Sequence, residues 1–162
     1  MDAADGAALI KWNRASFAVY GGRRSASEIS ELLNLEPDMH GDVGELTPAG
    51  HAGRKLKPQY LTYQRTYWSI DVDSDSHRVD AEDETGFAAL TALVGLLTPR
   101  AEALVELRKD AETVLWWSGD SDSTQGGFVL TADLIGQLAL LGCDIRGTAY
   151  ISVEESEVAR SD

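Results

Sequence analysis

The chain has 162 residues, of which 43% are hydrophobic and 25% are charged, and its formal net charge is -13 at pH 7. This length suits one hydrophobic core, and the apolar content excludes a chain that is disordered throughout. The negative charge repels phosphate backbones and anionic membrane surfaces, so we expect neither a nucleic-acid partner nor a membrane partner.

The expected location of the protein is the cytoplasm. The N-terminal stretch MDAADGAALI carries acidic residues where a secretory signal needs a basic start. No run of the sequence approaches the ~18 consecutive apolar residues of a membrane span. The single cysteine, Cys143, cannot form an intramolecular disulfide, which fits a reducing compartment.

The N-terminal third of the chain is predicted to contain one strand, one helix and one long connection. Residues 1–12 are small and polar for the most part, and we expect a flexible arm there. SFAVYG is then a short strand, Ser25 or Ser27 caps the helix that follows, and Pro37 ends it. Residues 36–61 are rich in glycine, proline and charge, so we predict a single loop.

Strand and helix patterns alternate in the middle of the chain. TYQRTYWSIDV alternates as a strand does, with Trp68 and Ile70 toward the core. Helical spacing runs from Phe87 to Leu107, and Pro99 predicts a break or kink within it. ETVLWWSG is expected to form the third strand.

The last part of the domain repeats the strand and helix alternation. Residues 128–130 predict a brief fourth strand, and Thr131 or Asp133 caps the final helix. Gly142 ends that helix, and DIRGTAYISV is expected to be the fifth strand.

These elements predict an α+β fold with a five-stranded, mainly antiparallel sheet and helices chiefly on one face. The single domain should span residues 13–154, with an acidic tail over 155–162. The stretch from Ser25 to Leu35 aligns with Thr131–Leu141 without a gap, so a ferredoxin-like pseudo-repeat is a further expectation. Duplication and convergence on a common capped helix both explain this match.

Acidic segments are the densest chemical signal. DVDSDSHRVDAE has carboxylates at the ligand positions of a calcium-binding loop, but Ser76 stands where that loop needs glycine, which favours a solvated loop. WSIDVDSDS and WSGDSDS share a form, and parallel neighbouring strands would bring their carboxylates to one rim, where a divalent ion could bind. The candidate metal ligands there are Asp71, Asp73, Asp120 and Asp122. Antiparallel strands would separate the two groups.

Two further segments contain candidate binding residues. His40 and His51 share the long loop with Asp42, and two imidazoles with a carboxylate could hold zinc, although surface histidines explain the pattern as well. YGGRRSAS places Arg23 and Arg24 ahead of a helix N-terminus, a composition that can bind an anion. The alternative is a flexible turn with solvated arginines.

The adjacent tryptophans of ETVLWWSG must point to opposite faces of their strand. We predict that Trp116 lies in the core and that Trp117 lies on the outer face with Leu115, where Tyr67 adds aromatic surface. Because such a face is too apolar to remain bare, we predict that these three residues bind a partner and that the protein is a homodimer through this face.

The order of segments resembles the bacterial family catalogued as domain of unknown function 4279. The resemblance rests on SFAVYG, SASEISELLNLEPD, Gly41-Asp42, RTYWSIDV, LTALVGLLTPRAEALVEL and GGFVLTADLIGQLALLGCDIRGTAYIS. It implies a small single-domain α+β protein with no assigned activity, and it transfers no catalytic residue. The chain is longer than the family pattern between Gly41 and Trp68.

Two functions are compatible with these features. The first is a non-enzymatic binding or interaction module, of an immunity-like or regulatory kind, that presents an aromatic patch and an acidic rim and needs no cofactor. The second is a metal-dependent hydrolase that uses the aspartates or the loop histidines. We favour the first, because the polar residues cluster in predicted loops without a recognised catalytic motif.

Overall fold

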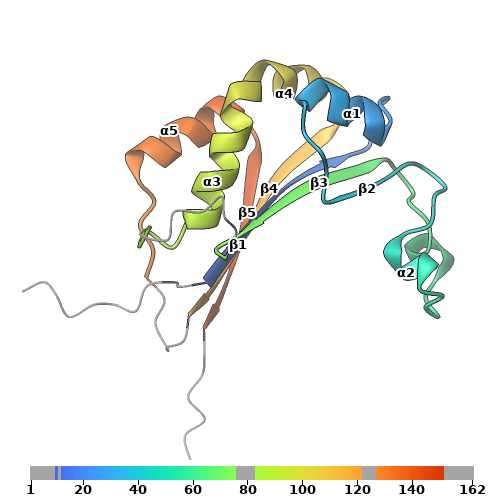
Figure 1. Cartoon of the computed structure of the whole chain (residues 1–162), viewed down its shortest axis with the longest axis horizontal. Coiled ribbons are helices and arrows are strands. Elements are labelled where there is room, and N and C mark those ends of the chain that lie inside the picture. Colours follow the sequence, from blue (N-terminus) through green and yellow to red (C-terminus); the bar gives the residue numbers. More distant parts are fainter. Residues whose placement is uncertain (1–9, 11, 76–82, 122–126, 152–162) are drawn as a thin grey trace, which may run out of the picture.

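The computed structural model describes residues 10, 12–75, 83–121 and 127–151, which form one five-stranded sheet with helices on one side (Figure 1). The strands are β1 (Trp12–Tyr20), β2 (Met39–Gly41), β3 (Tyr67–Asp73), β4 (Glu112–Ser121) and β5 (Asp144–Ile151). The α-helices are α1 (Ala26–Leu33), α2 (Pro48–His51), α3 (Ala88–Leu97), α4 (Ala101–Leu107) and α5 (Ala132–Leu141). Two 3-10 turns, η1 (Pro58–Tyr60) and η2 (Thr98–Arg100), complete the described elements.

The sheet has the strand order β2-β3-β1-β4-β5. β1 occupies the centre and pairs antiparallel with both β3 and β4, while β4 and β5 run parallel. β2 pairs antiparallel with β3 at the other edge. The predicted α+β class and the mainly antiparallel sheet are therefore confirmed, with one parallel pair at the β5 edge.

The identity of one strand differs from the prediction. Residues 128–130 are not a strand, because the Val129 amide donates to the Thr85 carbonyl at 2.7 Å rather than to the sheet. The fifth strand is instead β2, which lies within the residues 36–61 that were predicted to be a loop. β2 has only three residues, too few for an alternating pattern to be recognised.

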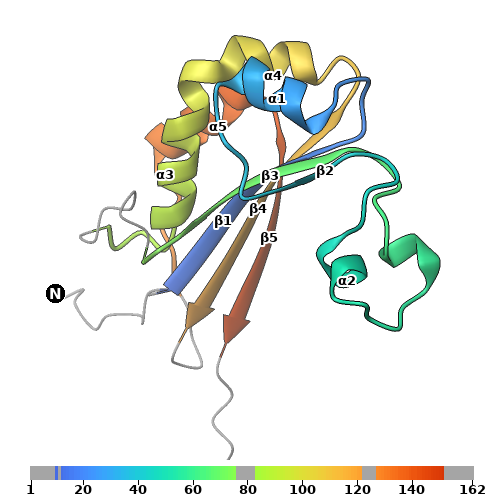
Figure 2. The same ribbon diagram turned by 45° about the vertical axis from the view of Figure 1, so that its right-hand side comes forward.

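Residues 42–66 form a lobe that contains α2 and η1 and extends away from the helical layer (Figures 1 and 2). Thr47 caps α2 by accepting from the Gly50 amide, and its hydroxyl donates to the Tyr60 carbonyl at 2.8 Å. Leu46 and Thr62 form an isolated antiparallel bridge. The predicted loop is thus an ordered segment that is held by its own hydrogen bonds.

Helix α1 begins and ends as its sequence indicates. Ser25 and Glu28 form a capping box, in which the Glu28 carboxylate accepts from the Ser25 amide at 2.7 Å. Asn34 ends the helix in the left-handed region, with a φ of 48°. The guanidinium of Arg100, in η2, donates to the carbonyls of Leu33 and Leu96 and so ties the ends of α1 and α3 together.

The helix break predicted at Pro99 is confirmed by η2, which separates α3 from α4.

α3 has no side-chain cap of its own, and Asn13 of β1 provides one, because its buried amide oxygen accepts from the Ala89 amide at 2.8 Å. Among the described residues, Ala88–Leu107 is the one helical stretch with the length and apolar composition of a membrane span. Leu90, Leu93 and Leu97 of α3 lie in the core, and Leu96 packs against it.

The core lies between the sheet and the helices α1, α3, α4 and α5. Trp68 and Ile70 point into it, as predicted, and Trp68 packs edge to face against Phe17 with ring centroids 6.3 Å apart. Ile10 is also buried and Trp12 opens β1, although the sequence placed both in the flexible arm.

The predicted repeat has limited structural meaning. Ser25 and Thr131 both cap their helices. Ile29 is fully buried in α1, whereas its counterpart Ile135 in α5 is 49% exposed, so the two helices bury different positions of the aligned stretch. α4 contacts both α1 and α5 and lies between them. The two units therefore do not pack side by side.

Candidate functional site

In the described part of the chain, no helix covers the second face of the sheet (Figures 1 and 2). The adjacent tryptophans of β4 have opposite environments, but in the reverse sense to the prediction. Trp117 is 7% exposed and Leu115 is fully buried, whereas Trp116 is 39% exposed. The predicted outer placement of Trp117 and Leu115 is therefore wrong.

The register with β1 explains this reversal. Leu115 pairs with Phe17 and Trp117 pairs with Ala15, so both share the core face of the central strand. Trp116 pairs with Ser16 on the opposite face. Both faces of β4 are apolar in sequence, so the strand by itself does not define its inner side.

The helix-free face carries a set of contacting aromatic and charged side chains, which we call the aromatic–arginine row. Within it, the Tyr20 and Tyr67 rings lie 5.3 Å apart, and Tyr63 from the lobe stacks on Tyr67 at 6.0 Å. The Arg65 guanidinium lies 4.5 Å from the centroid of the Tyr20 ring. The residues of the row are Tyr20, Tyr63, Arg65, Tyr67, Glu112, Trp116 and Arg146.

Glu112 connects the two halves of the row. Its carboxylate contacts Arg65 at 2.9 Å and Arg146 at 3.7 Å. Arg146, on β5, in turn lies 5.1 Å from the Trp116 ring centroid. The row therefore spans four strands of the sheet, from Tyr67 on β3 to Arg146 on β5.

Asp71, Asp73 and Asp120, the described members of the aspartate set predicted to crowd at one rim, lie on the same face but do not converge. β3 and β4 run in the same direction, as the metal hypothesis requires, but β1 lies between them, so two strand spacings, about 10 Å, separate their aspartates across the sheet. Asp71 lies opposite Ser16 and Asp120 opposite Trp12, and this four-residue offset adds about 13 Å along the strands. Arg14 occupies this gap and pairs with Asp71 at 3.3 Å. Asp73 belongs to β3 as well, and Asp122 lies outside the described residues.

His40 and His51, by contrast, do line one small cavity, of about 260 Å³, beside β2. The carboxylate of that lining, Asp38, accepts from the Asp71 amide at 2.7 Å. Asp42 is engaged at the start of α1, where it accepts from the Ala26 amide. In the ranges that the structure describes, no group of three histidine, cysteine or acidic side chains is placed to hold a metal ion.

Of the two arginines predicted to bind an anion, Arg24 pairs with carboxylates through its guanidinium, whereas Arg23 contacts one through its backbone amide. Arg24 contacts Glu106 at 3.3 Å and Asp110 at 3.2 Å, and the Arg23 amide donates to Asp110. Lys109 also pairs with Glu106. These residues tie the β1–α1 turn to the end of α4. The Arg24 guanidinium therefore has a structural role and is not free to bind an anion.

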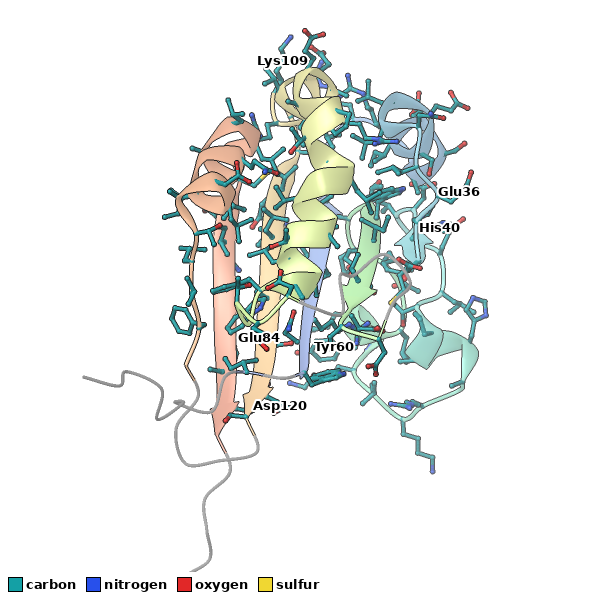
Figure 3. All side chains as sticks on the ribbon, turned by 60° about the vertical axis from the view of Figure 1, so that its left-hand side comes forward. Glu36, His40, Tyr60, Glu84, Lys109 and Asp120 are labelled. Atoms are coloured by element: carbon teal, nitrogen blue, oxygen red, sulfur yellow. The ribbon has the colours of Figure 1, made fainter. Side chains whose placement is uncertain are left out.

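A larger cavity of about 600 Å³ lies between α1, β2 and the start of the lobe, and sequence reasoning missed it. Glu36 and His40 lie next to one another on this side of the molecule (Figure 3). The lining includes four carboxylates, of which Asp42 and Glu45 are occupied by backbone amides. The cavity is therefore acidic, and hydrogen bonds fix part of its wall.

Comparison with known proteins gives one result. A family model described as a domain of unknown function, DUF4279, matches residues 10–152. The chain belongs to the DUF4279 family. No curated protein and no solved structure matches it.

The DUF4279 match covers every described element, including the residues of the aromatic–arginine row. The resemblance expected from the sequence is thereby confirmed. Of the three residues predicted to bind a partner, Tyr67 does lie on the helix-free face, next to Tyr20. Sequence reasoning missed the row itself, because its members come from separate segments and only the strand order brings them together.

Two tyrosines of the row have raised pKa values. Burial is the main cause for Tyr67, and the neighbouring rings and the Asp71 carboxylate raise its pKa further. Burial and then the Glu45 carboxylate raise the pKa of Tyr63. Both phenols are therefore neutral hydrogen-bonding groups at physiological pH.

Proposed function

We propose that this DUF4279 protein is a non-enzymatic interaction module that binds a protein partner through the helix-free face of its sheet. The observation that carries the proposal is the aromatic–arginine row, which spans this face from Tyr67 to Arg146. Aromatic residues and arginine are enriched in protein interfaces, and tyrosine, tryptophan and arginine dominate their binding energy.

The row is also preorganised for binding. Arg65 is held by the Tyr20 ring and the Glu112 carboxylate, and Arg146 is held by Glu112 and the Trp116 ring. A partner that contacts these side chains immobilises fewer rotamers than it would on free surface arginines. This lowers the entropic cost of association, which is about 0.5–1.5 kcal/mol for each flexible side chain.

The charge of the protein favours a basic partner. The net charge of -13 extends an attractive field toward cationic proteins, and Asp71 and Asp120 add carboxylates to the helix-free face beside the row. Such a field accelerates association and is screened by salt. We therefore expect the association rate, more than the dissociation rate, to fall as ionic strength rises.

Four polar side chains outside the row have structural partners that engage them in holding the fold. Asp38, Asp42 and Glu45 accept backbone amides, and Arg24 pairs with two carboxylates. A catalytic acid, base or metal ligand needs its reactive atoms to face the substrate. These side chains are committed to holding the fold.

Site-specific photo-crosslinking in the source cells tests the proposal. A photoreactive phenylalanine analogue at position 116 or 20 probes the helix-free face, and the same analogue at Val105 of α4, which is 52% exposed, is the matched control. We expect one protein species to crosslink from positions 116 and 20 and not from 105. Capture of the same species from all three positions would contradict the proposed face.

Variants of the row then measure its contribution. Arg65→Ala and Trp116→Ala should each raise the dissociation constant of the crosslinked partner at least about tenfold, the effect of losing a contact worth roughly 1.4 kcal/mol. Val105→Ala should leave the affinity unchanged. Unchanged binding by both row variants, with the fold intact, would place the interface elsewhere.

A further inference from the structure

The sheet ends at β5, which has a strand neighbour only on its β4 side in the described part of the chain. β5 has eight residues, DIRGTAYI, and the charged ones are Asp144 and Arg146. Natural sheets protect exposed edges with short strands, lysine or proline. The opposite edge follows this rule, because β2 has only three residues, whereas β5 presents a long edge without lysine or proline.

The same part of the molecule concentrates exposed apolar side chains. Seven of the fifteen large hydrophobic residues that are exposed in the described ranges fall between residues 128 and 151, although this segment has only three charged residues. They are Phe128, Val129, Leu130, Ile135, Leu140, Ile145 and Tyr150. Tyr150 lies on the helix-free face, because it pairs with Asp120, whereas Ile145 and the exposed residues of α5 lie on the helix-covered side of the β5 edge. Exposed apolar groups gathered at a sheet edge favour an edge that is covered by a partner.

Ile145 shows how the open strand edge leaves core-facing groups exposed. It pairs in register with Leu115, so both side chains point to the helix-covered face. Leu115 is fully buried there, but Ile145 is 45% exposed, because β5 has no second strand neighbour among the described residues. Above this edge lies α5, whose Ile135 is 49% exposed (Figure 3).

We infer that a second copy of this chain pairs with β5 in the antiparallel sense and continues the sheet across a twofold axis. An antiparallel strand satisfies the free edge of β5 by the same hydrogen-bond pattern in both copies. The twofold axis is perpendicular to the sheet, so the two α5 helices lie on the same face and approach each other. An added peptide strand would cover the edge but would leave the exposed side chains of α5 in water.

The charge of β5 is compatible with self-pairing of this acidic chain. Each chain carries -13, but β5 has one acidic and one basic side chain, so the strand itself adds no net charge to the contact. The remaining repulsion is long-range and screened, which predicts tighter self-association as NaCl rises from about 0.05 to 0.5 M. An interface held by ion pairs would weaken instead.

This dimer uses the sheet edge and leaves Arg65 and Trp116 on the helix-free face accessible, and of the aromatic–arginine row only Arg146 lies on the pairing strand. Sedimentation velocity over a concentration series tests it. We expect a dimer at about 100 μM or below, and Ile145→Lys should raise its dissociation constant at least about tenfold. Val43→Lys, at a 66% exposed residue of the lobe, makes the same charge change and should leave the dimer intact.

A cysteine scan decides the geometry even if Ile145→Lys fails to fold. In a Cys143→Ser background, single cysteines at positions 146 to 149 are oxidised mildly, and Ser118→Cys on β4 serves as the control. Antiparallel self-pairing brings a residue opposite its own twin only at the centre of the paired strands, within the Cα separations of about 4.4–6.8 Å that disulfides allow. We expect one position, or two adjacent ones, to crosslink.

Three results would overturn the inference. The first is a monomer at about 100 μM, well above the dissociation constants of specific dimers with interfaces of standard size. The second is crosslinking that is equal at all scanned positions and at Ser118→Cys, which indicates random collision. The third is a dimer that Trp116→Ala abolishes and Ile145→Lys leaves unchanged, which would assign self-association to the helix-free face.

Discussion

Replacement of Trp117 by alanine should destabilise the fold far more than replacement of Trp116. Trp117 is 7% exposed and packs between Phe87, at 4.7 Å between ring centroids, and Phe128, at 6.3 Å. A buried aromatic ring removes about 150–250 Å² from water, which corresponds to roughly 4–6 kcal/mol at 25 cal/mol per Å². Measured Trp→Ala changes in cores cost about 3–5 kcal/mol, and we expect Trp117→Ala to fall in that range.

Replacement of Trp116 by alanine should cost less stability. Its ring is 39% exposed, and its specific contact is the Arg146 guanidinium, an interaction worth about 0.5–1 kcal/mol at an exposed site. Surface neighbours can also relax over an alanine, so we expect Trp116→Ala to cost about 1–2 kcal/mol.

Urea unfolding, followed by circular dichroism, measures both losses. Domains of this kind have a total stability of about 5–15 kcal/mol, so Trp117→Ala should lower the urea midpoint sharply while the slope of the transition stays constant. Trp117→Phe, which keeps a ring between Phe87 and Phe128, is the matched control and should retain most of the stability. A loss for Trp116→Ala equal to or greater than that for Trp117→Ala would refute the assignment of the two faces.

Three further predictions concern contacts that fix the helices and the lobe. Asn13→Ala should cost about 1–3 kcal/mol in urea unfolding, because it leaves a buried amide in the first turn of α3 without its acceptor. Hydrogen bonds from Ser25 hold the pKa of Glu28 below its usual 4.5, so Ser25→Ala should raise that pKa. The Glu28 carboxylate stabilises the fold above pH 4.5, and this contribution is lost as the pH falls through the folded pKa, so the substitution should make the contribution smaller. Carboxyl chemical shifts measured across the acid range test this. Gly41→Ala should displace the Tyr63 ring, whose nearest atom lies 2.0 Å from the added carbon, at a cost of about 1–3 kcal/mol; an unchanged ring environment by NMR would contradict the close approach.

Local sequence signals predicted the parts of the fold that depend on neighbours along the chain. The cap at Ser25, the break at Pro99 and the inward direction of Trp68 and Ile70 all follow from spacing within one segment. β2 was not predicted, because three residues are too few to show the alternating pattern of a strand. Its pairing with β3 also depends on tertiary contacts.

The candidate surface was only partly predictable. An uncovered sheet face with aromatic side chains follows from the composition of the strands, and Tyr67 lies on that face. The inner side of β4 could not be determined from sequence, because Leu115 and Trp117 are as apolar as Val114 and Trp116, and the register with Phe17 decides between the pairs. The contacts of Arg65 and Arg146 with Glu112 depend on the strand order, which periodicity does not specify.

The most direct test of the account is the reactivity of the four indoles, because the proposed surface requires a helix-free face that displays tryptophan. Mild oxidation with N-bromosuccinimide, quantified by peptide mass spectrometry, should modify Trp12 and Trp116 rapidly, since they are 40% and 39% exposed. Trp68 and Trp117, at 0% and 7% exposed, should react only as the protein unfolds. Oxidation of Trp117 in the folded protein as fast as that of Trp116 would contradict the face assignment, and with it the surface on which the proposed function depends.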